Sequence, residues 1–237
     1  MFNAILFDLD DTLLRNEMTR FVDAYWDTLL PKLLEIFPDR NIKTAISRAT
    51  QDMLLAKRSR KTLRQIFIET FEAETQLEFP KVESIFLDYY QREYRDVQKV
   101  TERVSGALEA LNAAYALTPN VVLATVPIFP LVAIEERMRW AGIADFPFAL
   151  VTSFEIMHVS KPNPQYYEEI ADLLSLPTTE CLMVGNDHQD DMVAQHVGMK
   201  TFLVDDYVRR GERQTYEPDY RGSLADVSAL FAQLAQE

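Results

Sequence analysis

Residues 4–12 of this chain read AILFDLDDT, an apolar run that passes directly into a cluster of carboxylates. An apolar run of this length is typical of a buried strand in a parallel sheet. In an open parallel sheet, ligands bind in the crevice beyond the carboxyl ends of the strands. Asp8 and Asp10 point the same way in an extended chain, so they can share a divalent cation or act as nucleophile and proton donor. We therefore place a candidate reaction centre here.

A long helical block follows this strand. Apolar residues recur four positions apart from Phe21 to Phe37, and Pro38 closes that helix. Similar helical patterns occupy residues 42–55, 63–71 and 82–90. No convincing strand interrupts the stretch, so the sequence predicts an inserted all-α cap domain over residues 16–100.

Strands and helices alternate from about Val104 onwards. The sequence predicts strands at 120–124, 148–151, 181–184 and 201–204, with helices ending at Gly142 and Gly198. This alternation favours an α/β fold with a Rossmann-like, doubly wound parallel sheet. Residues 1–15 and 101–237 are the expected catalytic core, the stretch 209–222 is its most irregular part, and the helical insertion is expected to cover the crevice as a lid.

The composition is that of an ordinary soluble globular protein, with 48% hydrophobic and 26% charged residues. No apolar segment is long enough to span a membrane, and the first residues lack the pattern of a signal peptide, so we expect a cytoplasmic protein. The net charge of −13 disfavours nucleic acids and anionic membranes as partners and attracts cations. An anionic substrate therefore needs a lysine, an arginine or a metal ion placed beside it. The single cysteine, Cys181, lies in a predicted strand and is expected to be a core residue.

Polar residues also follow the other predicted strands. Thr125 follows the second strand, Lys161 lies a loop beyond the third, and the acidic stretch GNDHQDD (185–191) follows the fourth. A carboxylate nucleophile, a proton donor, a hydroxyl, a lysine and a second acidic cluster are the groups that phosphoryl transfer to an aspartate requires. The carboxylates also need a cation and a lysine beside them to accept an anion.

This set of motifs resembles the haloacid dehalogenase superfamily of aspartate-nucleophile phosphohydrolases, in the expected order and over nearly the whole chain. The resemblance implies that Asp8 is the nucleophile and binds Mg²⁺ as cofactor. It implies that Asp10 transfers the proton and binds the metal through its main-chain carbonyl. Thr125, Val126 and Lys161 are expected to hold the substrate phosphate. The expected substrate is a small phosphorylated metabolite.

The fourth motif departs from the family pattern, which usually has Gly-Asp followed by a second Asp. This chain has Asn186 and then Asp187. One alignment makes Asp187 the metal ligand, supported by Asp191; the other places Asn186 toward the metal, supported by Asp190 or Asp191. We favour Asp187, because a hard dication gains more from a carboxylate than from an amide.

Several alternatives stay open on the sequence alone. A phosphomutase uses the same chemistry, and a non-catalytic binding protein can keep the fold. A 2-haloacid dehalogenase needs neither Mg²⁺ nor an acid at position 10, so Asp10 argues against it. The basic segment from Lys57 to Arg64 is expected to be a solvated helix face, with a patch for a carboxylate or a second phosphate as the alternative. His188 is expected to be an exposed loop residue, and both monomer and homodimer are compatible with the sequence.

Overall fold

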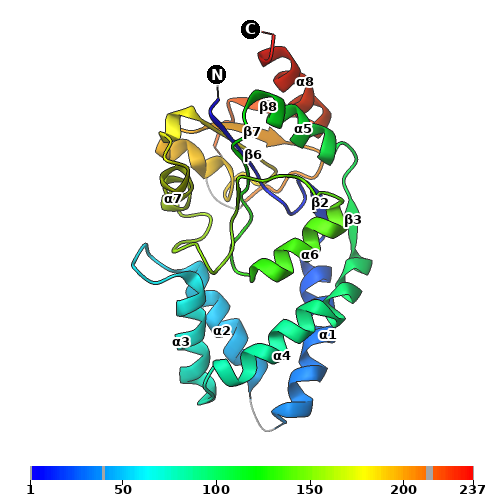
Figure 1. The fold of residues 1–237 in the computed structure, drawn as a ribbon, viewed down its shortest axis with the longest axis vertical. Helices are drawn as coiled ribbons and strands as arrows, with labels where there is room; N and C mark the ends of the chain where they lie inside the picture. Colours follow the sequence, from blue (N-terminus) through cyan, green and yellow to red (C-terminus); the bar gives the residue numbers. More distant parts are fainter. Residues whose placement is uncertain (1, 39–40, 212–215, 237) are drawn as a thin grey trace.

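The computed structural model describes residues 2–38, 41–211 and 216–236 and contains a parallel sheet of six strands (Figure 1). The strand order is β5-β4-β1-β6-β7-β8, and every neighbouring pair is parallel. The strands are β1 (Ala4–Phe7), β4 (Val121–Leu123), β5 (Leu150–Val151), β6 (Cys181–Gly185), β7 (Lys200–Val204) and β8 (Tyr220–Gly222). The predicted α/β fold with a doubly wound parallel sheet is confirmed.

The first strand lies at the centre of this sheet, between β4 and β6. All of its residues are fully buried, which explains why it reads as an uninterrupted apolar run. The chain connections change direction on either side of β1, and such a switch point is where open α/β sheets bind ligands. The carboxyl ends of β4, β1 and β6 therefore form one continuous polar edge.

Helices cover both sides of the sheet, with α5 and α8 on one side and α7 on the other (Figure 1). The helices of the sheet region are α5 (Ala107–Leu117), α6 (Leu131–Ala141), α7 (Gln165–Leu174) and α8 (Leu224–Leu234), with 3₁₀ helices η2 (Thr178–Glu180) and η3 (Met192–Val197). Gly142 caps α6 in the left-handed region at φ 77°, which explains the predicted stop.

At the end of the chain the structure adds two details to the expectations. The stretch 209–222 ends in a strand, β8, which extends the sheet beside β7. Its sequence, Tyr-Arg-Gly, has too little apolar character to indicate a strand, and residues 212–215 of the stretch lie outside the described ones. The helix expected before Gly198 is the short 3₁₀ helix η3.

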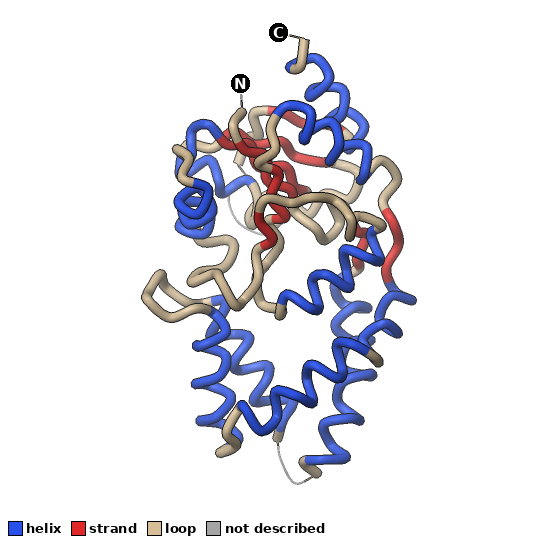
Figure 2. Tube along the Cα trace, viewed as in Figure 1, coloured by secondary structure: helices blue, strands red, loops and turns tan. Residues whose placement is uncertain are grey.

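An antiparallel pair of short strands, β2 (Leu14–Asn16) and β3 (Thr101–Arg103), leads the chain into the helical block and back. Between them lie α1 (Met18–Ile36), α2 (Ile42–Leu54), α3 (Leu63–Thr75), α4 (Pro80–Gln91) and the 3₁₀ helix η1 (Glu93–Val100). Figure 2 shows these helices as a body below the strands. The predicted apolar row of α1 is buried from Phe21 to Leu33. No helix among the described residues is both long and apolar enough to cross a bilayer.

Acidic partners neutralise much of the basic segment. Arg58 forms an ion pair with Asp172 of α7, which joins the loop after α2 to the sheet region. Lys61 pairs with Glu69, and Arg64 pairs with Glu83. These partly exposed pairs account for three of the segment's cations and favour the interpretation as a solvated surface. Residues 57–62 form a loop between α2 and α3, so the expected helix face was wrong.

Candidate active site

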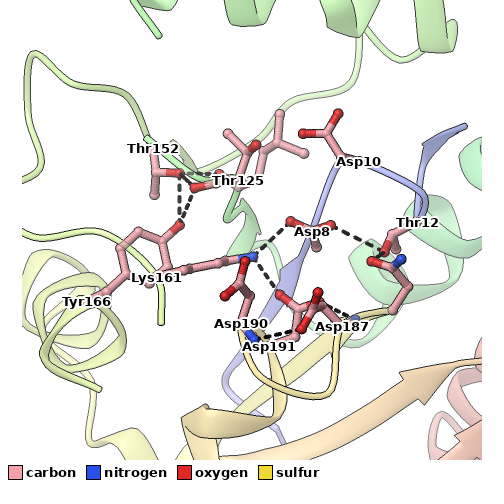
Figure 3. Close-up of polar contacts among 12 residues, drawn as sticks. Asp8, Asp10, Thr12, Thr125, Thr152, Lys161, Tyr166, Asp187, Asp190 and Asp191 are labelled. Carbon is pink, nitrogen blue, oxygen red and sulfur yellow. Dashed lines mark hydrogen bonds and ion pairs between the residues drawn. The ribbon is translucent and has the colours of Figure 1, made fainter. Parts of the chain in front are cut away.

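The centre of the polar edge is a buried lysine between two carboxylates. Lys161 donates hydrogen bonds to Asp8 Oδ1 at 2.8 Å and to Asp191 Oδ1 at 2.6 Å (Figure 3). Asp8 follows β1 directly, Lys161 lies in the loop before α7, and Asp191 ends the loop after β6. The structure thus brings together three residues that are far apart in the sequence.

Burial governs the protonation of this triad. Burial raises the pKa of Asp8 to about 7, because Lys161 offsets only part of the desolvation cost and neighbouring carboxylates add negative charge. Burial acts to lower the pKa of Lys161, but Asp191 and Asp8 hold it well above its usual value. The lysine is therefore a fixed positive charge beside the Asp8 carboxyl group.

Gly185 makes room for Asp191 at the end of β6. A Cβ atom at position 185 would lie 2.1 Å from Asp191 Oδ2. That oxygen also accepts a hydrogen bond from the main-chain nitrogen of Asp187 at 2.9 Å. Only glycine permits this close approach, so the glycine of the fourth motif positions the partner of Lys161.

Asp10 lies in a different environment from Asp8. Its Oδ1 accepts hydrogen bonds from Arg137 and, at 2.9 Å, from Asn16. Its carboxylate is turned away from the Lys161–Asp8 pair (Figure 3). Burial alone would raise the pKa of Asp10, but Arg137 and Asn16 bring it below its usual value. Asp8 and Asp10 therefore differ in their ionisation, and Asp10 is the stronger acid of the two.

The sequence analysis missed Arg137. It lies on α6, is 1% exposed, and its guanidinium carbon is 5.4 Å from the ring centre of Phe21 and 5.6 Å from that of Phe129. A signal was present, since Arg137 follows Ala133 and Ile134 by one helical turn on the apolar face of α6. A lone arginine on a buried helix face needs an acidic partner.

The other predicted phosphate contacts lie beyond β4. The Thr125 hydroxyl is fully buried, and no described residue hydrogen-bonds to it. Its carbonyl accepts hydrogen bonds from the hydroxyls of Tyr166 at 2.7 Å and Thr152 at 3.0 Å, which fix the loop (Figure 3). A buried hydroxyl without a partner is a candidate for binding a ligand.

Asn186 and Asp187 of the fourth motif have different hydrogen-bond partners. Asp187 Oδ1 accepts hydrogen bonds from the main chain of its own loop, at Gln189 and Asp190. Asn186 Nδ2 donates to the carbonyl of Tyr207 at 2.8 Å. Its Oδ1 lies 3.3 Å from the hydroxyl of Thr12, which is also 3.4 Å from Asp8 Oδ2. The Tyr207 contact thus fixes which way the Asn186 amide faces.

A cavity of about 260 Å³ is lined by Asp8, Asp10 and residues of the fourth motif. Its polar lining residues are Asp8, Asp10, Asn16, Arg137, Asn186, Asp187, Asp190, Asp191 and Arg209, and Val126 is among its apolar ones. The sequence analysis also missed Arg209, because it lies in the stretch expected to be irregular.

His188 is buried rather than exposed. Its main-chain nitrogen donates to the carbonyl of Arg209 at 3.1 Å, and Arg209 in turn donates to the carbonyl of Asn186 at 2.9 Å. This pairing covers the loop of the fourth motif, so the expected exposure of the histidine was wrong.

Comparison with known proteins identifies, over most of the chain, the family that the sequence motifs resemble. The sequence profile of the haloacid dehalogenase-like hydrolases matches residues 2–198. The pyrophosphatase PpaX of Bacillus anthracis is 24% identical over 220 residues, which cover 92% of this chain and 90% of the relative.

Solved structures share the fold at lower sequence identity. A 2-haloacid dehalogenase from Pseudomonas syringae pv. tomato is similar with a TM-score of 0.63 and 17% identity, over 99% of this chain and 100% of that one. A HAD phosphatase from Thermococcus onnurineus is similar with a TM-score of 0.56 and 19% identity, over 96% of this chain and 97% of that one. Both likenesses extend over the helical block as well as the sheet region.

Proposed function

The chain belongs to the haloacid dehalogenase-like hydrolases, and we propose that it is a Mg²⁺-dependent phosphatase that hydrolyses a small phosphorylated metabolite through an aspartyl-phosphate on Asp8. The observation that best supports this proposal is the Lys161 ammonium held 2.8 Å from Oδ1 of Asp8, a residue that lines the cavity. A carboxylate paired with a fixed cation can approach an anionic phosphate, which an unpaired carboxylate would repel.

The proposed reaction has two steps. A carboxylate oxygen of Asp8 attacks phosphorus, the bond from phosphorus to the ester oxygen breaks, and Asp10 gives a proton to the leaving alcohol. Water then attacks the phosphorus of the aspartyl-phosphate and loses a proton to Asp10, which releases inorganic phosphate and restores Asp8. Lys161 and the Thr125 hydroxyl bind phosphoryl oxygens in both steps.

Asp10 needs one oxygen that is accessible to the leaving group. The hydrogen bonds that Arg137 and Asn16 donate to its carboxylate both fall on Oδ1. We assign the proton transfer to Oδ2. In this assignment Arg137 is a positioning residue, because it holds the Asp10 carboxylate and does not itself touch the reacting atoms.

The residues around Asp8 fit a Mg²⁺ ion. Asp8 Oδ2 and Asn186 Oδ1 both lie within 3.4 Å of the Thr12 hydroxyl, so two hard oxygen donors share one small space. Among the described residues no three acidic, histidine or cysteine side chains group as a metal site. The ligand set that we propose therefore consists of Asp8, the main-chain carbonyl of Asp10 and an amide. When bound, the ion supplies positive charge to the phosphate and to Asp8.

The geometry supports Asn186 as the metal ligand. The sequence alone favoured Asp187. The Asp187 carboxylate is engaged with the main chain of its own loop through Oδ1. The Asn186 amide is turned by Tyr207 so that its oxygen faces Thr12 and Asp8. An amide oxygen is a weaker ligand than a carboxylate, so this ligand set would hold Mg²⁺ less tightly than an all-carboxylate one.

We further propose that residues 16–100 act as a cap and that residues 1–15 and 101–237 form the catalytic core. Residues of α1 and α2, among them Phe21 and Leu54, line the cavity opposite Asp8. A small movement of the helical block on the β2–β3 pair would then close the cavity and exclude bulk water.

Phosphate release from p-nitrophenyl phosphate tests the proposal. We expect release with Mg²⁺, loss of release with a chelator, and loss of release in Asp8→Asn. Asp11→Asn is a matched control, because Asp11 has φ 59°, a conformation that asparagine tolerates, and no role in the proposed reaction. Full activity of Asp8→Asn would overturn the proposal.

A dehalogenase is the second candidate, because solved 2-haloacid dehalogenases share this fold along the whole chain. Carbon–halogen hydrolysis uses the same nucleophile but needs no acid at position 10. Chloride release from 2-chloropropionate in the presence of a chelator, without phosphate release from any monoester, would favour this candidate. Phosphate transfer to a second alcohol instead of water would indicate a phosphomutase.

A further inference from the structure

A second cavity, of about 350 Å³, lies between the helical block and the loops of the sheet region. We call it the apolar chamber. It is lined by residues of α1, α2, α3 and α4 and by the loop residues 128–130 and 154–155. Its size falls in the range of small-molecule binding sites, about 300–1,000 Å³.

The wall of the chamber is mostly apolar, with Ser47, Thr50 and Gln51 as its uncharged polar residues. Phe67, Phe79 and Phe86 pack against one another on one side. The hydroxyls of Tyr25 and Tyr90 hydrogen-bond to each other at 2.9 Å, so these two rings also contribute apolar surface. Such a wall favours an apolar occupant and provides little to replace the water around a sugar or a phosphate.

The charged residues of the chamber already have partners. Glu155 accepts hydrogen bonds from the main-chain nitrogen of Leu131 at 3.1 and 3.2 Å. Arg64 and Glu83 form an ion pair, and both side chains are about one-third exposed (34% and 36%). A cation engaged in this way is a poor site for a second phosphate group.

The apolar chamber adjoins the cavity that contains Asp8. Val22, Leu54, Ile128 and Phe129 line both of them. Ile128 and Phe129 belong to the loop that follows Thr125, one of the proposed phosphate-binding residues. An extended group attached to a phosphate held at Asp8 and Lys161 would therefore meet these shared residues first and the chamber beyond them.

We propose that the apolar chamber binds the alcohol portion of the substrate, and that this portion is an extended apolar group, alkyl or aryl. The proposal rests on the proposed phosphatase function. It makes the preferred substrate the phosphate monoester of an apolar alcohol, in contrast to inorganic pyrophosphate or a sugar phosphate. Hydrolysis breaks the bond between phosphorus and the ester oxygen, and water supplies the proton of the released alcohol.

A series of straight-chain alkyl phosphates tests the chamber, because the leaving groups are chemically alike and differ in length. We expect kcat/KM to rise roughly three- to fourfold per methylene from butyl to hexyl phosphate, since each buried methylene adds binding energy. Inorganic pyrophosphate and glucose 6-phosphate should fall below hexyl phosphate. A kcat/KM that does not change with chain length would overturn the inference and leave the phosphatase function intact.

A matched pair of variants locates the binding site. Thr50 and Thr44 both lie on α2, and only Thr50 lines the chamber. Thr50→Trp should fill the chamber and lower the ratio of kcat/KM for hexyl phosphate to that for methyl phosphate at least tenfold. Thr44→Trp makes the same chemical change outside the chamber and should leave this ratio as it is. An equal effect of the two substitutions would contradict the assignment.

Binding of n-hexanol separates the chamber from the reaction. Hexanol has no phosphate, so calorimetric titration measures the chamber alone, whether or not the chain hydrolyses phosphate esters. We expect binding that Thr50→Trp weakens at least tenfold and Thr44→Trp does not. Hexanol binding without any phosphatase activity would refute the proposed function and keep the chamber as an apolar site. Phosphatase activity without hexanol binding would refute the chamber.

Discussion

The carboxylate of Asp10 is ion-paired with the guanidinium of Arg137, a residue that is almost completely buried. Asn16 donates to the same carboxylate oxygen, so Asp10 is held from two sides. The pair joins the polar edge beyond β1 to α6, where Arg137 lies against the rings of Phe21 and Phe129. One contact thus connects a proposed proton-transfer residue, the sheet region and α1 of the helical block.

Removal of Arg137 should destabilise the fold strongly. Arg137→Met leaves the Asp10 carboxylate buried without its counter-charge, and breaking a buried pair in this way costs about 3–5 kcal/mol. Asp10→Asn removes the other charge. The two residues share one interaction. The free energy of unfolding of the double variant should therefore fall by about 1–3 kcal/mol less than the sum of the decreases in the two single variants. Urea denaturation of the four proteins measures this coupling, and additive losses would contradict it.

Gly185→Ala should reduce activity without unfolding the chain. The added methyl group would lie 2.1 Å from Asp191 Oδ2, so Asp191 must move away from Lys161. A displacement of about 1 Å at a reaction centre can cost roughly a hundredfold in rate, and we expect a loss of that size. Circular dichroism and thermal unfolding check that the fold persists.

Gly211→Ala is the control for this prediction. A Cβ atom at position 211 would also lie 2.1 Å from another atom, but that atom belongs to the Gln189 side chain, which can rotate away. Activity close to the unsubstituted level is therefore expected. If both alanine variants lose activity equally, the close approach of Asp191 to Gly185 is not what the site depends on.

The sequence predicted the residues that follow buried strands. Asp8 and Thr125 come directly after apolar runs, and in a parallel sheet such residues share one edge. Lys161 was found through its place in the order of the motifs. All of these signals are local in the sequence, so a pattern of residue types was sufficient to find them.

The sequence could not predict the partners that meet through space. Arg137, Asn16 and Arg209 come from three different elements, and nothing in their neighbouring residues points to β1. The orientation of Asn186 was equally hidden, because the carbonyl of Tyr207 sets it. This is why the sequence favoured Asp187 as the metal ligand on charge alone, while the geometry supports Asn186.

The tyrosines of the helical block should make the protein unfold at alkaline pH. Burial raises the pKa of Tyr25 to about 12 and those of Tyr90 and Tyr94 well above the usual value of about 10. In the unfolded chain these groups ionise near pH 10, so the stability that their neutral forms provide is complete below about pH 10 and is lost above it. Tyrosinate absorbance and far-UV circular dichroism should therefore change together. Ionisation of all tyrosines near pH 10 with the helices intact would contradict this expectation.

Mg²⁺ titration of three variants decides between Asn186 and Asp187. If Asn186 is the ligand, Asn186→Asp should tighten Mg²⁺ binding because a carboxylate replaces an amide, and Asn186→Leu should weaken it about tenfold or more. Asp187→Ala should change the affinity less than Asn186→Leu does. Calorimetry, or the rise of Tm with Mg²⁺ concentration, measures binding independently of turnover. A larger loss of affinity in Asp187→Ala than in Asn186→Leu would restore Asp187 as the ligand, because the hydrogen bonds from its own loop would then leave its second oxygen available to the ion.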